Sequence, residues 1–393
     1  MDAQSGPLPV RTLVFLAAAC FASAASLRAC DPILPDLAAA FSTTPGDAAK
    51  VITFFGAAYA TTQFLYGFIG DRYGHLRVVA ITTFLSGIST LLCAVAGSLD
   101  FLVLARIAVG LTAAAIIPLS FAWIGGVVPY ERRQAVLAYF LSGQISGIVL
   151  GQAFAGIIAE HFGWRIVFVV IATLFAVAGT ALFFELRQRK EVAVPPRSFS
   201  GSPLSRLTTM LRRPWVAVVL AGAFFEGMVF FGAYTFVGSY LWARFGLSLD
   251  LIGLIVAGFG IGGLIYAATA ARMLPRLGET GLVLSGGILV AISFVIITIA
   301  PAAGWVVPAT ILAGFSYYMI HNTLQTHATQ MAPDARGLAV ATFASCLFFG
   351  QAVGVALAAP VFDNTGGVPI FLAAGALLFL FAVLFRALIL RRV

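Results

Sequence analysis

The chain has 393 residues, of which 61% are hydrophobic and only 10% are charged, with a formal net charge of +8. A soluble domain of ordinary size cannot bury so much apolar surface, so the composition indicates an all-α membrane protein with many spans. The four cysteines lie in apolar runs without paired spacing, which indicates neither a disulfide framework nor a zinc site.

Apolar runs of about 20 residues recur along the whole chain, and each is long enough to cross the ~30 Å hydrocarbon core of a bilayer as an α-helix. Charged residues, Gly and Pro divide these runs into twelve predicted membrane helices. Their expected ranges are 11–34, 48–70, 78–97, 101–125, 135–159, 165–185, 214–241, 250–271, 281–300, 305–328, 337–361 and 368–390.

The first predicted helix, 11–34, contains two charges in the stretch SLRACDPILPDL, Arg28 and Asp31. Residues three apart share one face of a helix, so these charges can partly neutralise each other. The prolines of this stretch favour a helix end, which places Asp31 near the outer mouth of the bundle and Arg28 about one turn deeper. The alternative is a solvated pair at a helix end. The segment also resembles a signal peptide, but the arginine at the potential cleavage site argues against cleavage.

The connection between the second and third predicted helices, GFIGDRYGHLR at 67–77, is rich in glycine and charge. Asp71 can accept hydrogen bonds from the free N–H groups of a neighbouring helix start, or pair with Arg72 or Arg77. We expect this cluster to be a gate that closes one side of the molecule; the alternative is that its positive charge only sets the topology. Three glycines remove side-chain bulk where the helices cross the short turn: Gly67, Gly70 and Gly74.

Ionisable side chains inside membrane helices cost about 3 kcal/mol on insertion scales and usually face a cavity or a partner. The fourth predicted helix contains Arg106, which we expect either to line a cavity or to donate hydrogen bonds between helices. The second contains Tyr59 and Gln63, which can add aromatic and amide contacts to the same cavity or serve only in packing.

Two predicted helices contain glycines four residues apart, Gly147 and Gly151 in the fifth and Gly350 and Gly354 in the eleventh. This spacing lets helix backbones approach each other closely. We therefore expect these glycines to be helix-packing sites, either with a part in movement or as packing alone.

The only long polar stretch, LRQRKEVAVPPRSFSGSPLSRLTTMLRRP, follows the sixth predicted helix. Its Arg, Pro and Ser content is typical of a linker. The sequence thus predicts an N-terminal six-helix bundle at 1–186, a cytoplasmic linker at 187–213 and a C-terminal six-helix bundle at 214–393.

The basic residues lie mainly on one side of the predicted membrane. If the N-terminus is inside, most of the 23 Lys and Arg residues fall in cytoplasmic segments, and only Lys50, Arg165 and Arg244 fall outside. The positive-inside rule therefore predicts cytoplasmic termini. Because this sidedness accounts for the net charge, the charge does not indicate a nucleic-acid partner.

The seventh predicted helix contains Glu226 near the middle of the membrane, with no charged neighbour in the sequence. The tenth contains His321, Asn322 and Gln325, and residues four apart on a helix share a face, which suits a polar cavity wall. The alternatives are a protonated Glu226 bonded to a backbone carbonyl and a structural His321. Since His327 lies six residues from His321 and points elsewhere, we predict no metal site.

The two halves of the chain repeat each other. DRYGHLRVV at 71–79 matches PRLGETGLV at 275–283 with an offset of 204, and the two glycine pairs match with an offset of 203. Because the offset exceeds six helices and is almost constant, the halves have the same topology, as in transporters whose site lies between two moving halves.

The internal charges do not follow this repeat. At an offset of 204, Arg28 matches Gly232, Asp31 matches Thr235 and Arg106 matches Thr310. The scaffold repeats while the charges do not, which favours a functional site over a structural role for them.

These features resemble the major facilitator superfamily over nearly the whole chain. GFIGDRYGHLR is similar to the family's signature G-x-x-x-D-R-x-G between helices 2 and 3, with His75 and Leu76 in place of the usual basic pair. RIAVG at 106–110 resembles the helix 4 signature. SGIVLGQAFAG at 146–156 resembles the helix 5 antiporter signature, with Gln152 in place of its proline.

The resemblance implies twelve membrane helices in two parallel six-helix repeats around a central cavity. In this family helices 1, 4, 7 and 10 line the cavity, and the internal charges of this chain fall on those four helices. The resemblance also implies a multi-pass protein of the inner membrane, without a cofactor, that binds a small-molecule substrate, protons and lipid as a monomer.

We expect a proton-driven secondary transporter, similar to the drug/proton antiporter branch that includes sugar-efflux permeases, and therefore an exporter of small organic molecules. One alternative is a proton-coupled importer of a small anionic metabolite held by Arg28 and Arg106. Another is a membrane sensor or scaffold that does not transport. The sequence contains no nucleotide-binding loop and no catalytic constellation, so we do not expect an enzyme.

Glu226 is the predicted proton carrier, because desolvation disfavours its charged form deep in a span. Asp31, beside Arg28, is expected to stay ionised and to serve substrate binding or gating. If Glu226 is structural, Asp31 becomes the carrier.

Overall fold

The computed structural model describes residues 9–188, 203–333 and 336–392, so the predicted linker at 187–213 lies partly outside the described residues. The described residues form helices with short connections and contain no β-strand. The predicted all-α class is therefore confirmed.

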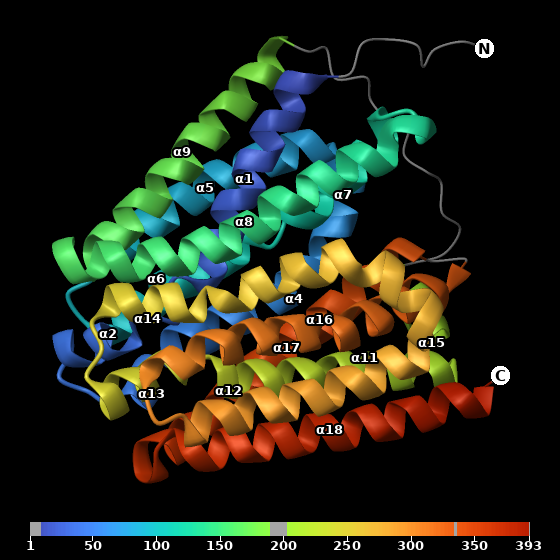
Figure 1. Cartoon of the computed structure of the whole chain (residues 1–393). Helices are drawn as coiled ribbons and strands as arrows, with labels where there is room; N and C mark the ends of the chain where they lie inside the picture. The colour runs from blue at the N-terminus through green and yellow to red at the C-terminus, as the bar shows by residue number, and fades with distance from the viewer. Residues whose placement is uncertain (1–8, 189–202, 334–335, 393) are drawn as a thin grey trace, which may run out of the picture.

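The helices fall into two groups in chain order, which Figure 1 shows as mostly blue-to-green ribbons above and yellow-to-red ribbons below. The first group contains α1 (Val10–Arg28), α2 (Leu34–Ala40), α3 (Pro45–Ala48), α4 (Lys50–Tyr73), α5 (His75–Ala94), α6 (Leu99–Ala113), α7 (Ile116–Val127), α8 (Tyr130–Phe162) and α9 (Trp164–Gln188). The second contains α10 (Pro203–Leu211), α11 (Pro214–Glu226), the π-helix η1 (Gly227–Phe231), α12 (Gly232–Tyr234), α13 (Val237–Phe245), α14 (Leu249–Val256), α15 (Gly258–Ile299), the 3₁₀ helix η2 (Ala303–Trp305), α16 (Val306–Gln330), α17 (Arg336–Thr365) and α18 (Gly367–Arg392).

Among the described residues, 10 helical stretches are long and apolar enough to cross a membrane. α4 coincides with the predicted second span but is not one of the 10. One of the 10, the stretch 249–299, covers the predicted eighth and ninth spans together. Gly278 interrupts it with φ 65° and ψ 175°, a conformation that favours glycine, so the helix breaks between those two predicted spans.

The first predicted helix, 11–34, consists of two helices joined by a turn. α1 ends at Arg28, residues 29–33 form the turn, and α2 adds seven further residues. Pro35 lies in the first turn of α2, where the missing N–H of proline costs no hydrogen bond. The helix thus ends just before the prolines, as expected, while Asp31 lies in a buried turn, 2% exposed, and its place near an outer mouth stays a prediction.

Both ends of the described chain lie at one end of the molecule, which we call the termini end (Figure 1). There Thr12 in α1 donates a 2.8 Å hydrogen bond to Glu185 in α9. Within the second half, Trp215 near the start of α11 stacks on Phe385 in α18. The opposite end, where α8 meets α9 and α17 meets α18, is called the far end below.

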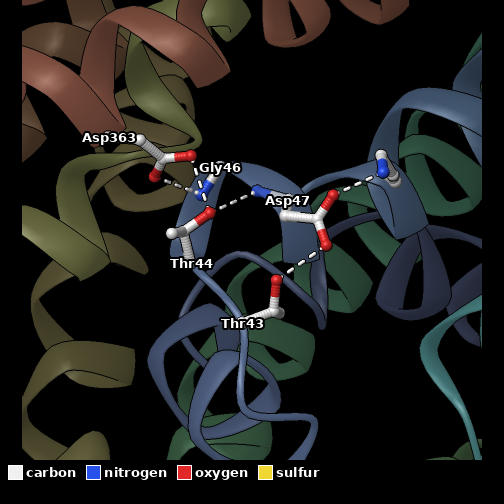
Figure 2. Close-up of polar contacts among 6 residues, drawn as sticks. Thr43, Thr44, Gly46, Asp47 and Asp363 are labelled. Carbon is white, nitrogen blue, oxygen red and sulfur yellow. Dashed lines mark hydrogen bonds and ion pairs between the residues drawn. The ribbon is translucent and has the colours of Figure 1, made fainter.

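The two halves contact each other along two lines, α4 against α17 and α8 against α14. On the first line the rings of Tyr59 and Phe348 lie 4.7 Å apart between centroids. On the second, a Cβ atom on Gly253 would lie 3.0 Å from the Cα atom of Gly156, so the two backbones touch. At the far end Asp363 in α17 also accepts hydrogen bonds from the segment around α3, as Figure 2 shows. At the far end, hydrogen bonds therefore add to the packing contacts between the halves.

The predicted packing glycines of α8 lie where this helix crosses α1. A Cβ atom on Gly147 would lie 3.1 Å from the Cα atom of Phe21, and one on Gly151 would lie 2.6 Å from the Cα atom of Ala25. Only glycine allows this close approach of the two backbones.

The glycines of α17 make the same kind of contact with the helix that begins as α11. A Cβ atom on Gly350 would lie 2.8 Å from the carbonyl carbon of Phe224, and one on Gly354 would lie 2.7 Å from that of Met228. These glycines and their partners lie 203 residues after those of α8 and α1. The same helix contact is thus made once in each half.

Candidate functional site

The structure brings Arg28 and Asp31 together in the interior. Nη1 of Arg28 lies 3.5 Å from Oδ2 of Asp31, and both residues are 2% exposed. The pair spans the start of the turn between α1 and α2, because Arg28 is the last residue of α1. The contact expected from the spacing is therefore present, in a turn and not along one continuous helix.

Three further residues from other helices surround this ion pair. Gln152 in α8 donates from Nε2 to Oδ2 of Asp31 at 3.4 Å. Nη2 of Arg28 donates to Oε1 of Gln351 in α17 at 3.1 Å, and its guanidinium lies 3.7 Å from the ring centroid of Phe231. Since Gln351 and Phe231 belong to the second half, the pair joins the two halves. We call these five residues the bridging cluster.

The bridging cluster contains polar atoms that lack a hydrogen-bond partner among the described residues. Nη1 of Arg28 also lacks a hydrogen bond but has the ion pair with Asp31. The atoms with neither are Oδ1 of Asp31, Oε1 of Gln152 and Nε2 of Gln351. Buried polar atoms are seldom left unpaired, so these two acceptors and one donor are suited to water or to a polar ligand. In the sequence Gln152 is recognisable only as a replacement for proline, and Gln351 was not predicted as a site residue. The signal that both share is an amide directly after a packing glycine, Gly151 or Gly350.

Glu226 is fully buried at the end of α11, directly before the π-helix η1. Its Oε2 atom lies 2.9 Å from Nδ1 of His321 in α16. The same nitrogen lies 3.2 Å from the hydroxyl of Tyr317, whose ring stacks on the imidazole. The structure thus brings together two residues that the sequence analysis assigned to one cavity, and it adds Tyr317.

The contacts of Glu226 give the pair a definite chemistry. An ionised carboxylate buried without a partner costs several kcal/mol, and the imidazole of His321 provides one. A proton between the two groups can reside on the carboxylate or on the ring, so the pair can hold a proton without leaving an isolated charge. π-helical turns are rare and often mark functional sites, which fits the position of η1 beside Glu226.

Phe231 connects this pair to the bridging cluster. Its ring lies 3.7 Å from the guanidinium of Arg28 on one side. On the other side its ring centroid lies 5.1 Å from that of Tyr317, which contacts His321. The two buried polar groups are therefore neighbours separated by aromatic rings.

Arg106 is fully buried and serves as a link between helices of the first half. Its Nη1 atom donates to the carbonyl and hydroxyl oxygens of Ser26 at 3.3 Å, and its Nε atom donates to the carbonyl of Val51 at 3.3 Å. Thr310, at an offset of 204, donates to the carbonyl of Ile255, which lies 204 residues after Val51. The contact is repeated although the charge is not, which favours the interhelical alternative for Arg106.

The other predicted cavity residues lie apart from Glu226. Tyr59 is fully buried against Phe348, and Gln63 is buried on α4. On α16, Asn322 is half-buried and Gln325 is exposed. None of these four makes a hydrogen bond to Glu226 within the described part of the chain.

The predicted gating motif lies at the end of α4, at the termini end. Oδ1 of Asp71 lies 3.2 Å from Nε2 of His75, whereas Arg72 and Arg77 are exposed. The partner of Asp71 is thus the histidine that replaces a usual basic residue, and neither of the two arginines named by the sequence analysis.

The three glycines of this motif differ in their surroundings. Gly74 has φ 91° and forms the turn, and a Cβ atom on Gly70 would lie 2.6 Å from Leu119. Gly67 faces open space, with no atom within 4 Å of a Cβ atom placed there. The expected removal of bulk is therefore present at Gly70, Gly74 is needed for the backbone conformation of the turn, and the expectation for Gly67 does not hold in this structure.

Metal-binding groups do not gather within the described residues. No cluster of three or more His, Cys, Asp or Glu side chains is found among them. His327 points away from His321, and its Nε2 atom lies 3.4 Å from Oε2 of Glu279.

The chain is similar to known transporters in sequence. Residues 15–335 and 240–393 match the family model described as Major Facilitator Superfamily. A "Probable sugar efflux transporter" of Pasteurella multocida (strain Pm70) is 25% identical over 365 residues, which cover 91% of this chain and 86% of its own. The "Multidrug export protein EmrB" of Haemophilus influenzae is 30% identical over 163 residues, which cover 41% of this chain and 32% of its own.

Solved structures show the same fold at low sequence identity. The nucleoside transporter NupG superposes with a TM-score of 0.76 at 14% identity, covering 96% of this chain and 98% of its own. A bacterial homologue of the human lysosomal transporter Spinster, in an inward-facing and occupied conformation, superposes with a TM-score of 0.75 at 17% identity, covering 98% of both chains. Since the family model matches nearly the whole chain, the protein belongs to the major facilitator superfamily, whose members are transporters and not enzymes.

Proposed function

We propose that this protein is a proton-coupled secondary transporter that exports small organic molecules by alternating access. The observation that carries the proposal is the fully buried carboxylate of Glu226, which lies 2.9 Å from Nδ1 of His321. A carboxylate and an imidazole at this distance can share one proton. Such a pair can take up a proton from one side of the membrane and release it to the other when the halves move.

The bridging cluster is the proposed substrate site. Arg28 and Asp31 supply opposite charges, and Gln152 and Gln351 supply amides from the two halves. A polar substrate that replaces these contacts changes how the halves are tied together. Phe231 places this site beside the proton-binding pair, which supports direct coupling between substrate and proton.

Export is favoured over import by the relatives and by one contact. Two of the similar proteins have names that describe efflux or export. The import alternative relies on Arg28 and Arg106 to hold an anion, but Arg106 already donates to Ser26 and Val51 in the interior. One arginine is therefore left for that role.

We also propose the membrane arrangement that the sequence predicts. α4 and the break at Gly278 add two spans to the 10 apolar stretches, which gives twelve in two parallel six-helix repeats. The bundles at 1–186 and 214–393 are then joined by the linker at 187–213. The asymmetry of Arg and Lys supports cytoplasmic termini in the inner membrane of a bacterium. The protein is proposed to act as a monomer.

Proton flux in proteoliposomes tests this function. The full chain is reconstituted with a pH-sensitive dye inside, and lactose, uridine or ethidium is added in turn under a proton gradient. We expect at least one of these compounds to drive proton movement that empty liposomes do not show. Transport of a compound without proton movement would contradict the coupling. If none of the three is transported, the sensor or scaffold alternative gains support.

A further inference from the structure

Two acidic residues at the far end each accept a backbone N–H from the opposite half. Oε2 of Glu160 in α8 lies 2.7 Å from the N atom of Leu249. Oδ1 of Asp363 in α17 lies 2.9 Å from the N atom of Gly46, and its Oδ2 atom accepts a 2.7 Å hydrogen bond from the hydroxyl of Thr44 (Figure 2). We call these two contacts the far-end clasps.

The far-end clasps occupy matching positions in the two halves. Glu160 and Asp363 each lie two residues before the end of a long helix, α8 or α17. Each accepts from the first turn of a short helix, α14 or α3. Asp363 follows Glu160 by 203 residues, and Leu249 follows Gly46 by the same number. The same contact, from a carboxylate to the N–H group of a helix start, therefore occurs once in each half, with Glu160 in one case and Asp363 in the other.

The chemistry of the clasps suits a contact that forms and breaks. The first N–H groups of a helix have no partner within the helix, and a carboxylate is a strong acceptor for them. Both acids are exposed, so water and salt weaken the bonds and can replace them when the helices separate. The fit is also tight, because a Cβ atom on Gly46 would lie 2.6 Å from the carbonyl oxygen of Ala359.

Two neighbouring acids provide a natural comparison. Asp47 bonds to Lys50 and Thr43 in its own half (Figure 2). Both bonds lower the pKa of Asp47, and the bond from Lys50 has the larger effect. Asp250, which lies 203 residues after Asp47, bonds to Ser248 in its own half. Each of these acids lies one residue after a clasped N–H group, and neither side chain makes a hydrogen bond to the other half within the described residues, although the charge of Asp250 interacts with His161 of α8.

We propose that Glu160 and Asp363 are positioning residues of the transport cycle. One clasp lies beside the contact of α4 with α17 and the other beside the contact of α8 with α14. Together they hold the far end closed, and both must break before this end can open. This inference rests on the proposed function, because it requires a cycle in which the far end opens.

Distances between spin labels test the clasps. In a Cys346→Ala background, which removes the one cysteine that is not buried, labels at Ala40 and Val368 report on the far end. Labels at Tyr73 and Leu277 report on the termini end. The full chain is measured in lipid nanodiscs, and the ratio of open to closed far-end distances is compared among variants.

We expect Glu160→Gln and Asp363→Asn each to raise this ratio about fivefold, since each weakens one charged hydrogen bond. The double variant should raise it by about the product, because the clasps lie on separate lines of contact. The termini-end distance should shorten at the same time, which a local structural defect would not cause. Gly46→Ala keeps both carboxylates and should also favour the open far end.

Asp47→Asn and Asp250→Asn serve as matched controls and should change the ratio less than about twofold. The proposal is overturned if the double variant and Gly46→Ala leave the ratio at the wild-type value, or if the controls change it equally. If the wild type moves protons in the proteoliposome assay but the variants leave the open-to-closed ratio unchanged, the role of the clasps is overturned and the proposed function is not. If the variants change the open-to-closed ratio but the wild type moves no protons, the proposed proton coupling is overturned and the role of the clasps is not.

Discussion

Glu226, His321 and Tyr317 form a chain of groups in which one nitrogen has two possible partners. Nδ1 of His321 lies 2.9 Å from the carboxylate and 3.2 Å from the hydroxyl. If it carries a proton it donates to Glu226, and if it does not it can accept from Tyr317 or from a protonated Glu226. A change in the protonation of Glu226 therefore alters the contacts of α16, which offers a direct route from proton binding to helix movement.

Arg28 and Asp31 should behave as a unit in stability measurements. Loss of either leaves an unpaired charge in the interior, so we expect Arg28→Leu and Asp31→Leu each to lower the free energy of unfolding by about 3 kcal/mol. Arg28 also donates to Gln351, so Arg28→Leu should have the larger effect of the two single substitutions. The double variant should cost less than the sum. Thermal unfolding of the four proteins in one detergent measures this cycle, and strict additivity would show that the two charges do not interact.

Arg106 should matter for stability and not for substrate affinity. Arg106→Leu removes the hydrogen bonds to Ser26 and Val51, which should lower the free energy of unfolding by about 2 kcal/mol. The affinity for a transported compound should stay within about twofold of the wild-type value. Binding and unfolding measured on the same preparation check this pair of outcomes. A large loss of affinity with unchanged stability would return Arg106 to the substrate site.

At the scale of residues, contacts between side chains close in the sequence could be predicted, and contacts between distant ones could not. Arg28 and Asp31 are three apart, so their pairing follows from spacing alone. Glu226 and His321 are 95 residues apart, and only the packing of α11 on α16 brings them together. Gln351 could not be recognised as a partner of Arg28, because the two residues lie in different halves.

At the scale of helices, α11 and α17 owe their close contact to glycine. The backbone changes from α-helix to π-helix after Glu226, and a Cβ atom on Gly227 would lie 3.0 Å from the carbonyl carbon of Leu347. The π-helical turn and this glycine occur where the carboxylate is held. The geometry of the Glu226–His321 pair, the proposed proton site, therefore depends on the contact between these two helices.

Glycine substitutions should separate packing positions from open ones. Gly350→Ala would place a Cβ atom 2.8 Å from the carbonyl carbon of Phe224, so we expect a loss of about 2 kcal/mol or more in unfolding free energy. Gly67→Ala meets no atom within 4 Å and should raise stability by up to about 1 kcal/mol, because alanine favours helix. Thermal unfolding compares the two. Equal effects of the two substitutions would contradict the packing role of Gly350.

The helix elements show where local sequence is ambiguous. Pro32 and Pro35 favour the end of a helix, and α1 does end nearby. A proline in a first turn also starts a helix, and α2 begins at Leu34. Whether a proline only ends one helix or also begins the next depends on whether the residues after it pack against other helices. Here Leu37 and Ala38 are buried, so a second helix forms. That surface is not visible in the local pattern.

At the scale of the whole molecule, the packing contacts and the far-end clasps recur between the halves, while the charges buried in the interior do not. The glycine contacts of α8 and α17 recur after 203 residues, and the hydrogen bonds of Arg106 and Thr310 reach carbonyls 204 residues apart. Glu226 and the Arg28–Asp31 pair have no such counterpart. These recurring glycine contacts were predictable because packing fixes glycines at constant spacing. The site was only partly predictable, since it depends on where the halves meet.

The central claim is that the Glu226–His321 pair carries the transported proton. The most direct test compares the wild type with Glu226→Gln in proteoliposomes, measuring substrate-driven proton movement together with substrate binding between pH 5 and pH 9. Glutamine keeps the size and a polar contact to His321 but cannot exchange a proton. We expect the variant to bind substrate with a weaker dependence on pH and to show no proton movement and no uphill transport. If it still moves protons and transports uphill, Glu226 is structural and Asp31 is the carrier.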